Sequence, residues 1–349
     1  MPSWFDRFGQ EWASVGLVDD PTNAQADAGW AYIGQAPPTV EQFNSMFQWA
    51  DDKDNWLYGQ IGNVIASENM LPDPNDLTQL LKAITGKLKL RLTAGYTIWC
   101  DAINGNDGNT GAQASPFRTI QRAMDWTLEN IEPAHQWVTI QLQPGTYEPF
   151  TLQTSFNGGI LVHGDIANAR SYLIKNTNGY ACQAAYAAWF AVQGISVEAA
   201  GGDTDYSTYG LGLAGVNTGV IIYKDIAFGP CSNSHIGAWN AGQVWSWGDG
   251  INYLIYGGSR THMSSSSAGI ITCAKAHVTI QNNPLFNIAY AYATVGGYIQ
   301  SWDFTFTGTC RGRHALLDAY GIANTKNINP DIHYPGDTVS YFGRGGIYV

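Results

Sequence analysis

Charge is scarce in this sequence. Only 13% of the 349 residues are charged, 17 basic and 28 acidic, which gives a formal net charge of −11. A phosphate backbone is held by clustered Lys and Arg side chains, and no such cluster occurs. No apolar run reaches the roughly 18 residues that a membrane span needs, and the first residues do not form a secretory signal. We therefore expect a soluble protein made in the cytoplasm, with neither nucleic acid nor a membrane as its partner.

Cysteine and histidine show no metal-binding pattern. The five cysteines are odd in number and far apart, without a Cys-x-x-Cys pair, and no two of the seven histidines are four residues apart. Neither a disulfide framework nor a zinc site has this distribution. The sequence predicts small buried thiols, no metal and no cofactor.

Glycine and aromatic residues are abundant instead. The 40 glycines and the 13% of aromatic residues favour β structure with many turns over a helical fold. Acidic residues are frequent before residue 90, whereas residues 150–330 are rich in β-branched residues, Gly, Asn and aromatics. This change in composition predicts two modules that meet near residue 90.

The first module is predicted to contain a helix that begins at Thr39, where Thr39 and Gln42 form a capping-box pattern. Apolar residues then follow at alternating spacings of three and four, with Asp54 as the exception. This spacing is typical of a coiled-coil seam, and equally of one amphipathic helix packed on its own domain. A second, short helix is predicted between Asp73 and Gly86. The seam residues are Val40, Phe43, Phe47, Ala50, Leu57, Ile61 and Val64.

The next segments combine turns, a helix and a strand. Residues 101–111 contain Asn-Gly and Asp-Gly turns, and a calcium loop is disfavoured because EF-hand spacing is absent. Residues 117–131 place apolar side chains on one helical stripe. Residues 138–143 have the composition of a strand, which Pro144 ends.

Paired short strands then recur as far as residue 325. The clearest match superimposes residues 192–197 on residues 223–228, and the other units recur at about 20 to 33 residues. This period predicts a parallel β-helix, in which apolar side chains stack into one core and Gly or Asn occupies left-handed corners. The helix at 117–131 would cover the open first coil. A β-sandwich is disfavoured because regular hairpin turns are missing between the units.

Two patches carry a family resemblance. Residues 30–44 contain a Pro-Pro…Phe-Asn motif, and residues 107–123 contain a Gly/Asn loop followed by Pro-Phe-x-Thr-Ile and a helix. The first is similar to a motif near the start of many tail-fibre proteins, and the second to the opening of the β-helix in pectate-lyase-like spikes. The chain therefore resembles phage or prophage tail spikes and tail fibres with a right-handed parallel β-helix.

The resemblance implies a mainly β homotrimer built in four parts and located on the virion after assembly in the host cytoplasm. Residues 1–90 would attach to the tail or baseplate through a helical stalk, and residues 91–135 would connect and cap the β-helix. Residues 136–330 would form a receptor-binding shaft, and residues 331–349 would pack between subunits. The implied function is adsorption to a glycan on the host surface.

Cleavage of that glycan is the alternative function, and it needs two carboxyl groups about 5 to 10 Å apart. Asp203 and Asp205, in a predicted insertion at 198–217, could form such a pair, and Asp249 lies in a later coil. Acidic residues beside Gly and Thr are more often solvated turn residues. No catalytic pattern of a capsule or lipopolysaccharide depolymerase is visible, so the sequence leaves an enzymatic activity open.

Glycan binding without cleavage has the better signal, in a predicted insertion at 229–250. It contains Trp239, Trp245 and Trp247, and Tyr206 and Tyr209 of the other insertion could extend the same surface. Indole faces stack on sugar rings, and nearby amide and carboxylate groups bind the hydroxyls. The alternative is structural, with these Trp side chains packed between coils or at a subunit interface.

Overall fold

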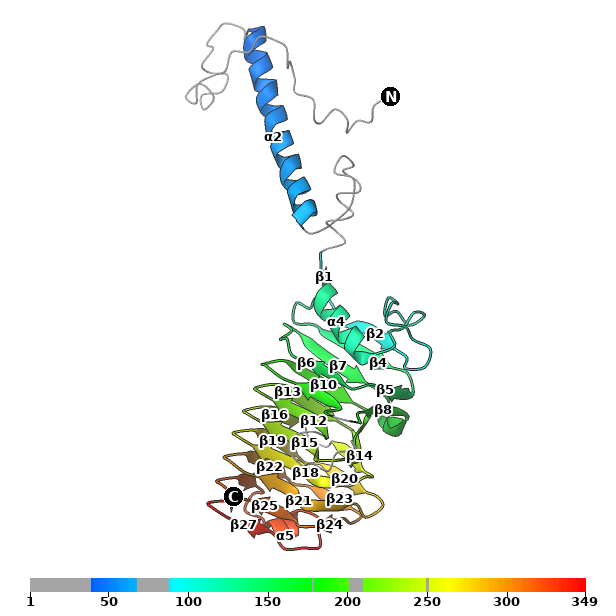
Figure 1. Ribbon diagram of the computed structural model, residues 1–349, viewed down its shortest axis with the longest axis vertical. Helices are drawn as coiled ribbons and strands as arrows, with labels where there is room; N and C mark the ends of the chain where they lie inside the picture. Colours follow the sequence, from blue (N-terminus) through cyan, green and yellow to red (C-terminus); the bar gives the residue numbers. More distant parts are fainter. Residues whose placement is uncertain (1–38, 68–87, 178, 201–209, 249–250) are drawn as a thin grey trace. The chain divides into compact units, whose positions relative to one another are not determined.

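The computed structural model describes residues 39–67, 88–177, 179–200, 210–248 and 251–349. The chain divides into two units, residues 1–88 and 89–349. In the first unit, helix α2 (Val40–Ser67) begins directly after Thr39, as the capping pattern predicts (Figure 1). The short helix predicted between Asp73 and Gly86 lies outside the described residues.

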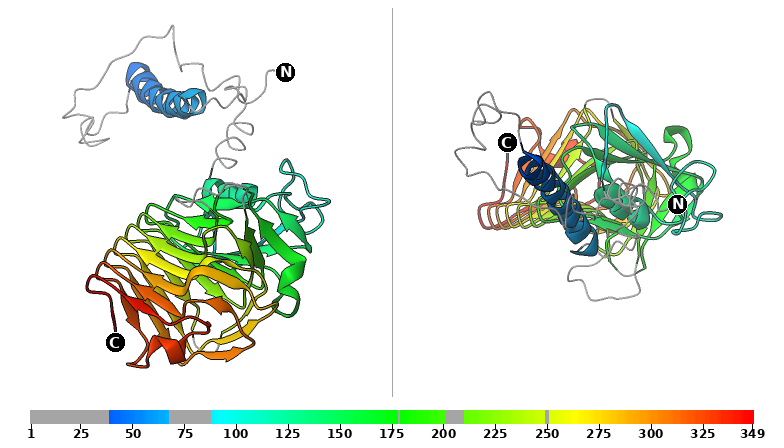
Figure 2. Two further views of the ribbon diagram at one scale, coloured as in Figure 1. Left: turned by 60° about the horizontal axis from the view of Figure 1, so that its bottom comes forward. Right: turned by 90° about the horizontal axis from the view of Figure 1, so that it is seen from above.

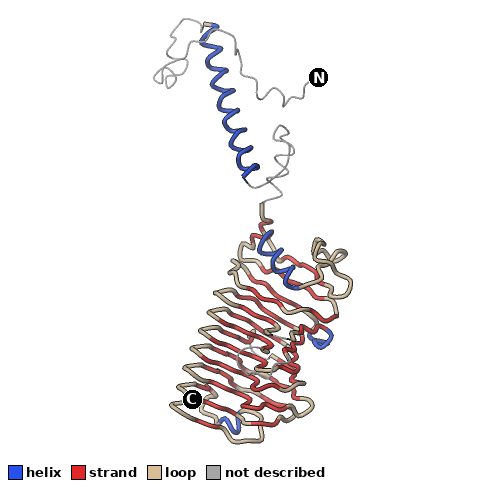
Figure 3. Tube along the Cα trace, viewed as in Figure 1, coloured by secondary structure: helices blue, strands red, loops and turns tan. Residues whose placement is uncertain are grey.

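The second unit is a parallel β-solenoid of three sheets, in which every pair of named strands is parallel (Figures 1 and 3). A two-stranded ladder of β1 (Leu90–Arg91) and β3 (Ile131–Glu132) precedes it. The ten-stranded sheet consists of β2 (Tyr96–Cys100), β4 (Trp137–Leu142), β7 (Gly159–His163), β10 (Trp189–Gln193), β13 (Val220–Lys224), β16 (Gln243–Ser246), β19 (Ile270–Ala274), β22 (Tyr298–Trp302), β26 (Ile322–Asn324) and β28 (Ile347–Tyr348).

The other two sheets complete each coil. The seven-stranded sheet consists of β5 (Gly145–Tyr147), β8 (Tyr172–Lys175), β11 (Ser196–Ala199), β14 (Ala227–Cys231), β17 (Asn252–Ile255), β20 (His277–Ile280) and β23 (Thr305–Thr307). The nine-stranded sheet consists of β6 (Phe150–Leu152), β9 (Cys182–Ala184), β12 (Leu211–Val216), β15 (Ser234–Trp239), β18 (Ser259–Ser266), β21 (Leu285–Ala293), β24 (Arg311–Gly312), β25 (Ala315–Leu317) and β27 (Tyr341–Phe342).

The repeat register predicted from sequence is confirmed. β10 pairs with β13 so that Val192 faces Tyr223, and β11 pairs with β14 so that Val197 faces Phe228. These are the residues that the 31-position repeat superimposes. Alternate residues of each strand point inward, and the buried side chains form one main core. The coils that enclose this core are stacked along the solenoid (Figure 2).

Helix α4 (Ile120–Asn130) covers the start of this core, as predicted for residues 117–131. It buries Ile120, Ala123 and Met124 and packs against strands of the first coils. The helix starts later than predicted because Phe117 is extended and bridges Cys100. Thr119 then caps the helix by accepting a hydrogen bond from the backbone N–H of Arg122.

The solenoid extends beyond residues 136–330 in both directions. β2 pairs with β4 in full register, so the first rung of the ten-stranded sheet already lies at residues 96–100. β27 and β28 add the last rungs to the nine- and ten-stranded sheets. Most of the segment 331–349 therefore belongs to the final coil.

Corners between the strands are left-handed, but most of them are not glycine. Between the ten- and seven-stranded sheets, Gly194 and Asp225 have φ of 64° and 52° at equivalent positions, and Lys275 and Asp303 repeat this conformation. The predicted preference for Gly or Asn therefore holds only in part. Hydrogen bonds to the next coil support two of these corners, from Gly194 N–H to the Asp225 carbonyl and from Lys275 N–H to the Trp302 carbonyl.

Candidate functional site

Five of the predicted site residues lie outside the described residues: Asp203, Asp205, Tyr206, Tyr209 and Asp249. The acid pair and the tyrosine extension of the glycan surface therefore stay predictions.

The segment 229–250 is not an insertion, contrary to the sequence-based interpretation. Most of it is one regular coil, in which β14, β15 and β16 pair with strands of the coils before and after. The inward residues Ile236, Ala238 and Val244 are fully buried. They alternate with Gly, Trp and Ser on the outer face, and this outer set gave the segment the composition of a loop.

The three tryptophans of this coil are divided between two sheets. Trp239 ends β15 in the nine-stranded sheet, whereas Trp245 points outward from β16 in the ten-stranded sheet and Trp247 follows that strand. A left-handed corner at Asn240 and Ala241 separates the two strands. Trp245 is 40% exposed and Trp247 is 37% exposed, while Trp239 is half-buried. They do not all lie on one sheet face.

Trp239 lies in a groove of about 380 Å³ on the nine-stranded sheet. Its indole Nε1 donates to the Ser264 hydroxyl at 3.4 Å. Asn240 is exposed at the rim, and its amide donates to Asn217 at 3.1 Å. Side chains with hydroxyl, amide and guanidinium groups line the rest of the groove: Asn233, Arg260, Thr261, Ser266, Tyr292 and Thr294. We call this the Trp239 groove.

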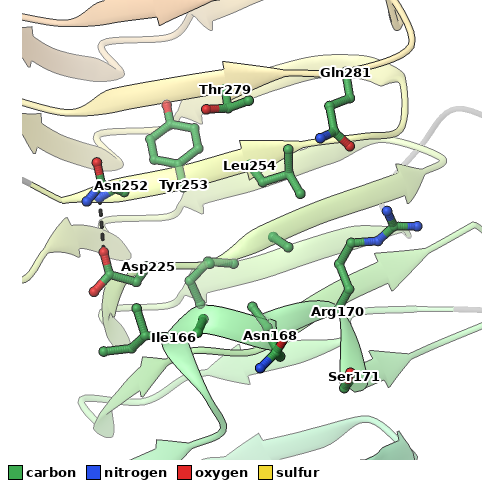
Figure 4. A pocket seen from close by; sticks show the side chains of 14 residues that line it. Ile166, Asn168, Arg170, Ser171, Asp225, Asn252, Tyr253, Leu254, Thr279 and Gln281 are labelled. Atoms are coloured by element: carbon green, nitrogen blue, oxygen red, sulfur yellow. Dashed lines mark hydrogen bonds between the residues drawn. The ribbon is translucent and has the colours of Figure 1, made fainter.

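A second groove, of about 460 Å³, lies on the seven-stranded sheet beside the 3-10 helix η3 (Ile166–Ser171). Asp165 fixes the start of η3, because its carboxylate accepts a hydrogen bond from the backbone N–H of Ala167 at 2.9 Å. The opposite wall comes from β17 and the end of β20. Figure 4 shows Arg170 of η3 and Gln281 of that wall pointing toward one another. We call this the Arg170 groove.

Asp225 lies at the other end of the Arg170 groove (Figure 4). Its carboxylate accepts hydrogen bonds from the Asn252 backbone N–H at 3.0 Å and from the Gln193 amide at 3.4 Å. Only 9% of this residue is exposed. The groove therefore has an acceptor end at Asp225 and a donor end at Arg170.

A chain of contacts holds Arg170 in place. Its guanidinium lies 4.5 Å from the centre of the Tyr256 ring. The Tyr256 hydroxyl bonds to Ser196 at 2.8 Å and to the Glu198 carboxylate at 3.0 Å, and Glu198 pairs with Lys175 at 3.3 Å. Burial is the main cause that raises the pKa of Tyr256 above its usual value, so this phenol stays protonated.

Room for this contact chain comes from a glycine. Gly229 lies beside both side chains, and a Cβ atom added there would lie 2.5 Å from the Tyr256 hydroxyl and 2.7 Å from Glu198 Cγ. The missing side chain lets Tyr256 reach across β14 to Glu198 on β11.

Two described carboxylates of the later coils are already paired with cations. Asp303 binds Lys326 at 2.6 Å, and Asp318 binds Arg344. Hydrogen bonding from Arg344 is the main cause that lowers the pKa of Asp318. A general acid needs a raised pKa, so Asp318 does not suit that role.

Sequence reasoning identified only Trp245 of a second set of aromatic residues, which point outward from the ten-stranded sheet. Trp302 donates its indole N–H to Asn324 at 3.1 Å and lies under the ammonium of Lys326. The strand alternation could have found this set, because each member is next to a buried inward residue. Its members are Trp99, Trp137, Trp189, Trp245 and Trp302.

The described residues contain neither a metal-binding cluster nor a membrane-spanning helix. Within residues 39–67, 88–177, 179–200, 210–248 and 251–349, no group of three His, Cys, Asp or Glu side chains is placed to hold a metal ion. In the same part of the chain, no helix has the length and apolarity to cross a membrane. All five cysteines are free and buried, as the spacing predicts.

Comparison with known proteins gives one family match and two weakly similar solved structures. Residues 103–156 match a family described as a protein of unknown function, DUF1565, a right-handed β-helix family. No curated protein matches the chain. Two solved chains of the GH136 lacto-N-biosidase from Eubacterium ramulus are weakly similar. The native protein is 10% identical, with a TM-score of 0.27, over 91% of this chain and 76% of that one. The selenomethionine derivative is 13% identical, with a TM-score of 0.28, over 90% and 77%.

Proposed function

We propose that this protein is a glycan-binding adhesin of the tail-spike or tail-fibre type, which binds a host surface glycan without cleaving it. The observation that carries the proposal is the Trp239 groove. It combines a half-buried indole with hydroxyl and amide side chains on a rigid sheet face. An apolar ring face with hydrogen-bonding groups beside it is the surface that a sugar ring requires.

Rigidity favours binding at this position. Three residues of the groove lie on consecutive rungs of one sheet: Trp239 on β15, Ser264 on β18 and Tyr292 on β21. Hydrogen-bonded rungs fix the spacing of the side chains before a ligand arrives, so little conformational entropy is lost on binding. Stacked coils also repeat the face along the solenoid, which suits an elongated polysaccharide.

The cleaving alternative has less support. Among the described acids of later coils, Asp303 and Asp318 are paired with cations, and Asp225 is engaged by two donors. Of the candidate acids from the sequence, Asp203, Asp205 and Asp249 remain for a depolymerase of capsule or lipopolysaccharide. An assay for new reducing ends, with the protein incubated with capsule or lipopolysaccharide, would separate cleavage from binding.

Attachment to a phage tail or baseplate through residues 1–90, as a homotrimer on the virion, is part of the proposal. Its support is the sequence resemblance and the surface of α2. Val40 is 70% exposed and Leu57 is 53% exposed, and both are on the predicted coiled-coil seam. Two further copies of the chain would bury these side chains in a parallel bundle.

The test of glycan binding uses a matched pair of exposed, left-handed asparagines. Asn240 is at the rim of the Trp239 groove, and Asn327 occupies a turn outside both grooves. Replacement by Gly removes each side chain without backbone strain. Binding to an array of bacterial capsule and lipopolysaccharide glycans should weaken for Asn240→Gly and stay unchanged for Asn327→Gly.

Replacement of the tryptophan gives the larger effect. Trp239→Ala should cost about 1 to 3 kcal/mol of glycan binding, and Trp245→Ala, on another sheet, should cost little. Melting temperatures measured in parallel separate loss of binding from loss of folding. Full glycan binding by folded Trp239→Ala and Asn240→Gly proteins would refute the proposal.

A further inference from the structure

We infer that the Arg170 groove binds the carboxylate of an acidic saccharide, such as a uronate or sialate residue, through the guanidinium of Arg170. The inference rests on the proposed glycan-binding function for the class of ligand. It concerns a different sheet from the Trp239 groove, and it adds a selectivity that the Trp239 groove does not provide.

The first argument is the state of the guanidinium. Arg170 stacks on Tyr256, and within the described part of the chain it forms no salt bridge or hydrogen bond through its side chain. By contrast, Arg122 and Arg344 are paired with carboxylates. The stacked plane of Arg170 thus keeps its N–H donors available for a ligand. A planar guanidinium binds a carboxylate through two parallel hydrogen bonds, which a sugar hydroxyl cannot accept in the same way.

The second argument is preorganisation. Tyr256 cannot move freely, because Ser196 and Glu198 hold its hydroxyl, and Lys175 holds Glu198. Most arginine side chains lose considerable rotamer entropy when they bind, and stacking on a fixed ring reduces that loss. An arginine that is held in place by such a series of contacts, and whose N–H donors are still available, is preorganised for binding.

The third argument is the charge pattern of the groove. Asp225 is at the far end of the groove, where it already accepts two hydrogen bonds, and Arg170 is opposite Gln281 (Figure 4). A saccharide in this groove would place its carboxylate at Arg170 and Gln281, and hydroxyl groups toward Asp225 and Asn252.

One acidic side chain, Glu198, lies near the stacked Arg170 and Tyr256. Glu198 lies behind Tyr256, where it is neutralised by Lys175 at 3.3 Å. The Lys175 ammonium therefore offsets the charge of this carboxylate. Binding of a ligand carboxylate by the Arg170 guanidinium should weaken as salt concentration rises, because exposed charge pairs are screened.

The experiment compares acidic oligosaccharides with their own neutral forms. The panel contains oligomers of galacturonate, glucuronate, mannuronate and sialate, each also with its carboxylates reduced to hydroxymethyl groups. Titration calorimetry with the full chain should show at least one acidic oligomer that binds more tightly than its reduced form. Arg170→Gln should weaken that binding roughly 10- to 100-fold and leave the reduced form unaffected.

Control variants distinguish the loss of the Arg170 charge from a change in the fold. Arg118 is also exposed, outside the groove, and Arg118→Gln should bind like the unmodified protein. Tyr256→Phe should preserve most binding because the stacking ring remains, whereas Tyr256→Leu should reduce it. Equal binding by Arg170→Gln and the unmodified protein would overturn the inference, and so would the absence of binding to every acidic oligomer.

The outcome is distinguishable from failure of the proposed function. If neutral glycans bind and depend on Trp239 while the acidic oligomers show no preference, only the inference about Arg170 is wrong. If no glycan binds at all, both are wrong. If acidic binding depends on Arg170 but is insensitive to Trp239→Ala, the Arg170 groove is a separate site.

Discussion

His235 and His262 lie side by side in the solenoid core, with 2.9 Å between their Nδ1 atoms. Both residues are fully buried, and His262 Nε2 lies 3.1 Å from the Tyr253 hydroxyl. One Nδ1 must donate and the other accept, so the contact requires at least one neutral ring. His235 Nε2 has no hydrogen-bond partner in the described structure. Burial lowers the pKa of His235 to about 3, and burial followed by the charge of His235 lowers that of His262.

This pair predicts a loss of stability in mild acid. Below the usual histidine pKa of 6.5, the unfolded chain binds protons that the native pair excludes. The free energy of unfolding should therefore be at its full value above pH 6.5 and should fall as the pH is lowered. Each histidine contributes a slope of up to about 1.4 kcal/mol per pH unit. Urea titrations at pH 7.5, 6.5 and 5.5 measure it.

Two variants identify the source of that slope. His262→Phe retains a ring in the core and removes one titrating group, so it should reduce the pH dependence even though it lowers stability at pH 7.5. His277 is exposed, and His277→Asn should leave the slope unchanged. A slope that is the same in all three proteins would show that other groups cause the acid sensitivity.

The register of the β-solenoid was predictable from sequence because burial repeats in the same order in every coil. Val192 and Tyr223 are paired because both point inward at the same place. The sequence pattern did not reveal a second constraint, namely a glycine after six of the corners between the nine- and ten-stranded sheets. A Cβ atom at Gly242 would lie 2.0 Å from the Gly215 carbonyl oxygen of the preceding coil. Equivalent close approaches occur at Gly219, Gly269, Gly297, Gly321 and Gly346.

The candidate sites were less predictable from sequence, because they depend on which side chains of neighbouring coils lie on the same sheet face. Trp239 and Trp245 are six residues apart, yet the corner between them puts them on different sheets. Arg170 and Tyr256 are far apart in sequence, and they meet because Gly229 opens the face between two rungs. Composition predicts neither arrangement. To predict them, one must know the register of three consecutive coils and the volume of the side chain in the middle coil.

Asp107 is predicted to be a structural residue of the turn-rich stretch at 101–111. Its Oδ1 accepts hydrogen bonds from the backbone N–H groups of Arg118 and Thr119, both at 2.9 Å, and its Oδ2 accepts one from the Thr119 hydroxyl. Thr119 in turn caps α4.

Asp107→Ala should lower the free energy of unfolding by about 1 to 3 kcal/mol, because the carboxylate bonds to backbone donors are lost. Asp107→Asn, which keeps one acceptor, should cost less, and added calcium should change neither melting temperature. A calcium-dependent rise in melting temperature that disappears in Asp107→Ala would show a metal loop instead.

The exposed seam of α2 predicts the oligomeric state. Leu57 is 53% exposed and Val40 is 70% exposed on a helix of 28 residues, and most helical stability in proteins comes from the packing of such an apolar face. Three parallel copies would bury the seam, so light scattering should give three times the chain mass of 37.9 kDa. Leu57→Lys would place three ammonium groups in one layer of the bundle and should shift the mass toward that of a monomer. Asp52→Lys changes charge at another exposed position of the same helix, and it should leave the mass unchanged. A monomer at micromolar concentration, or equal masses for both variants, would mean that α2 does not join the subunits.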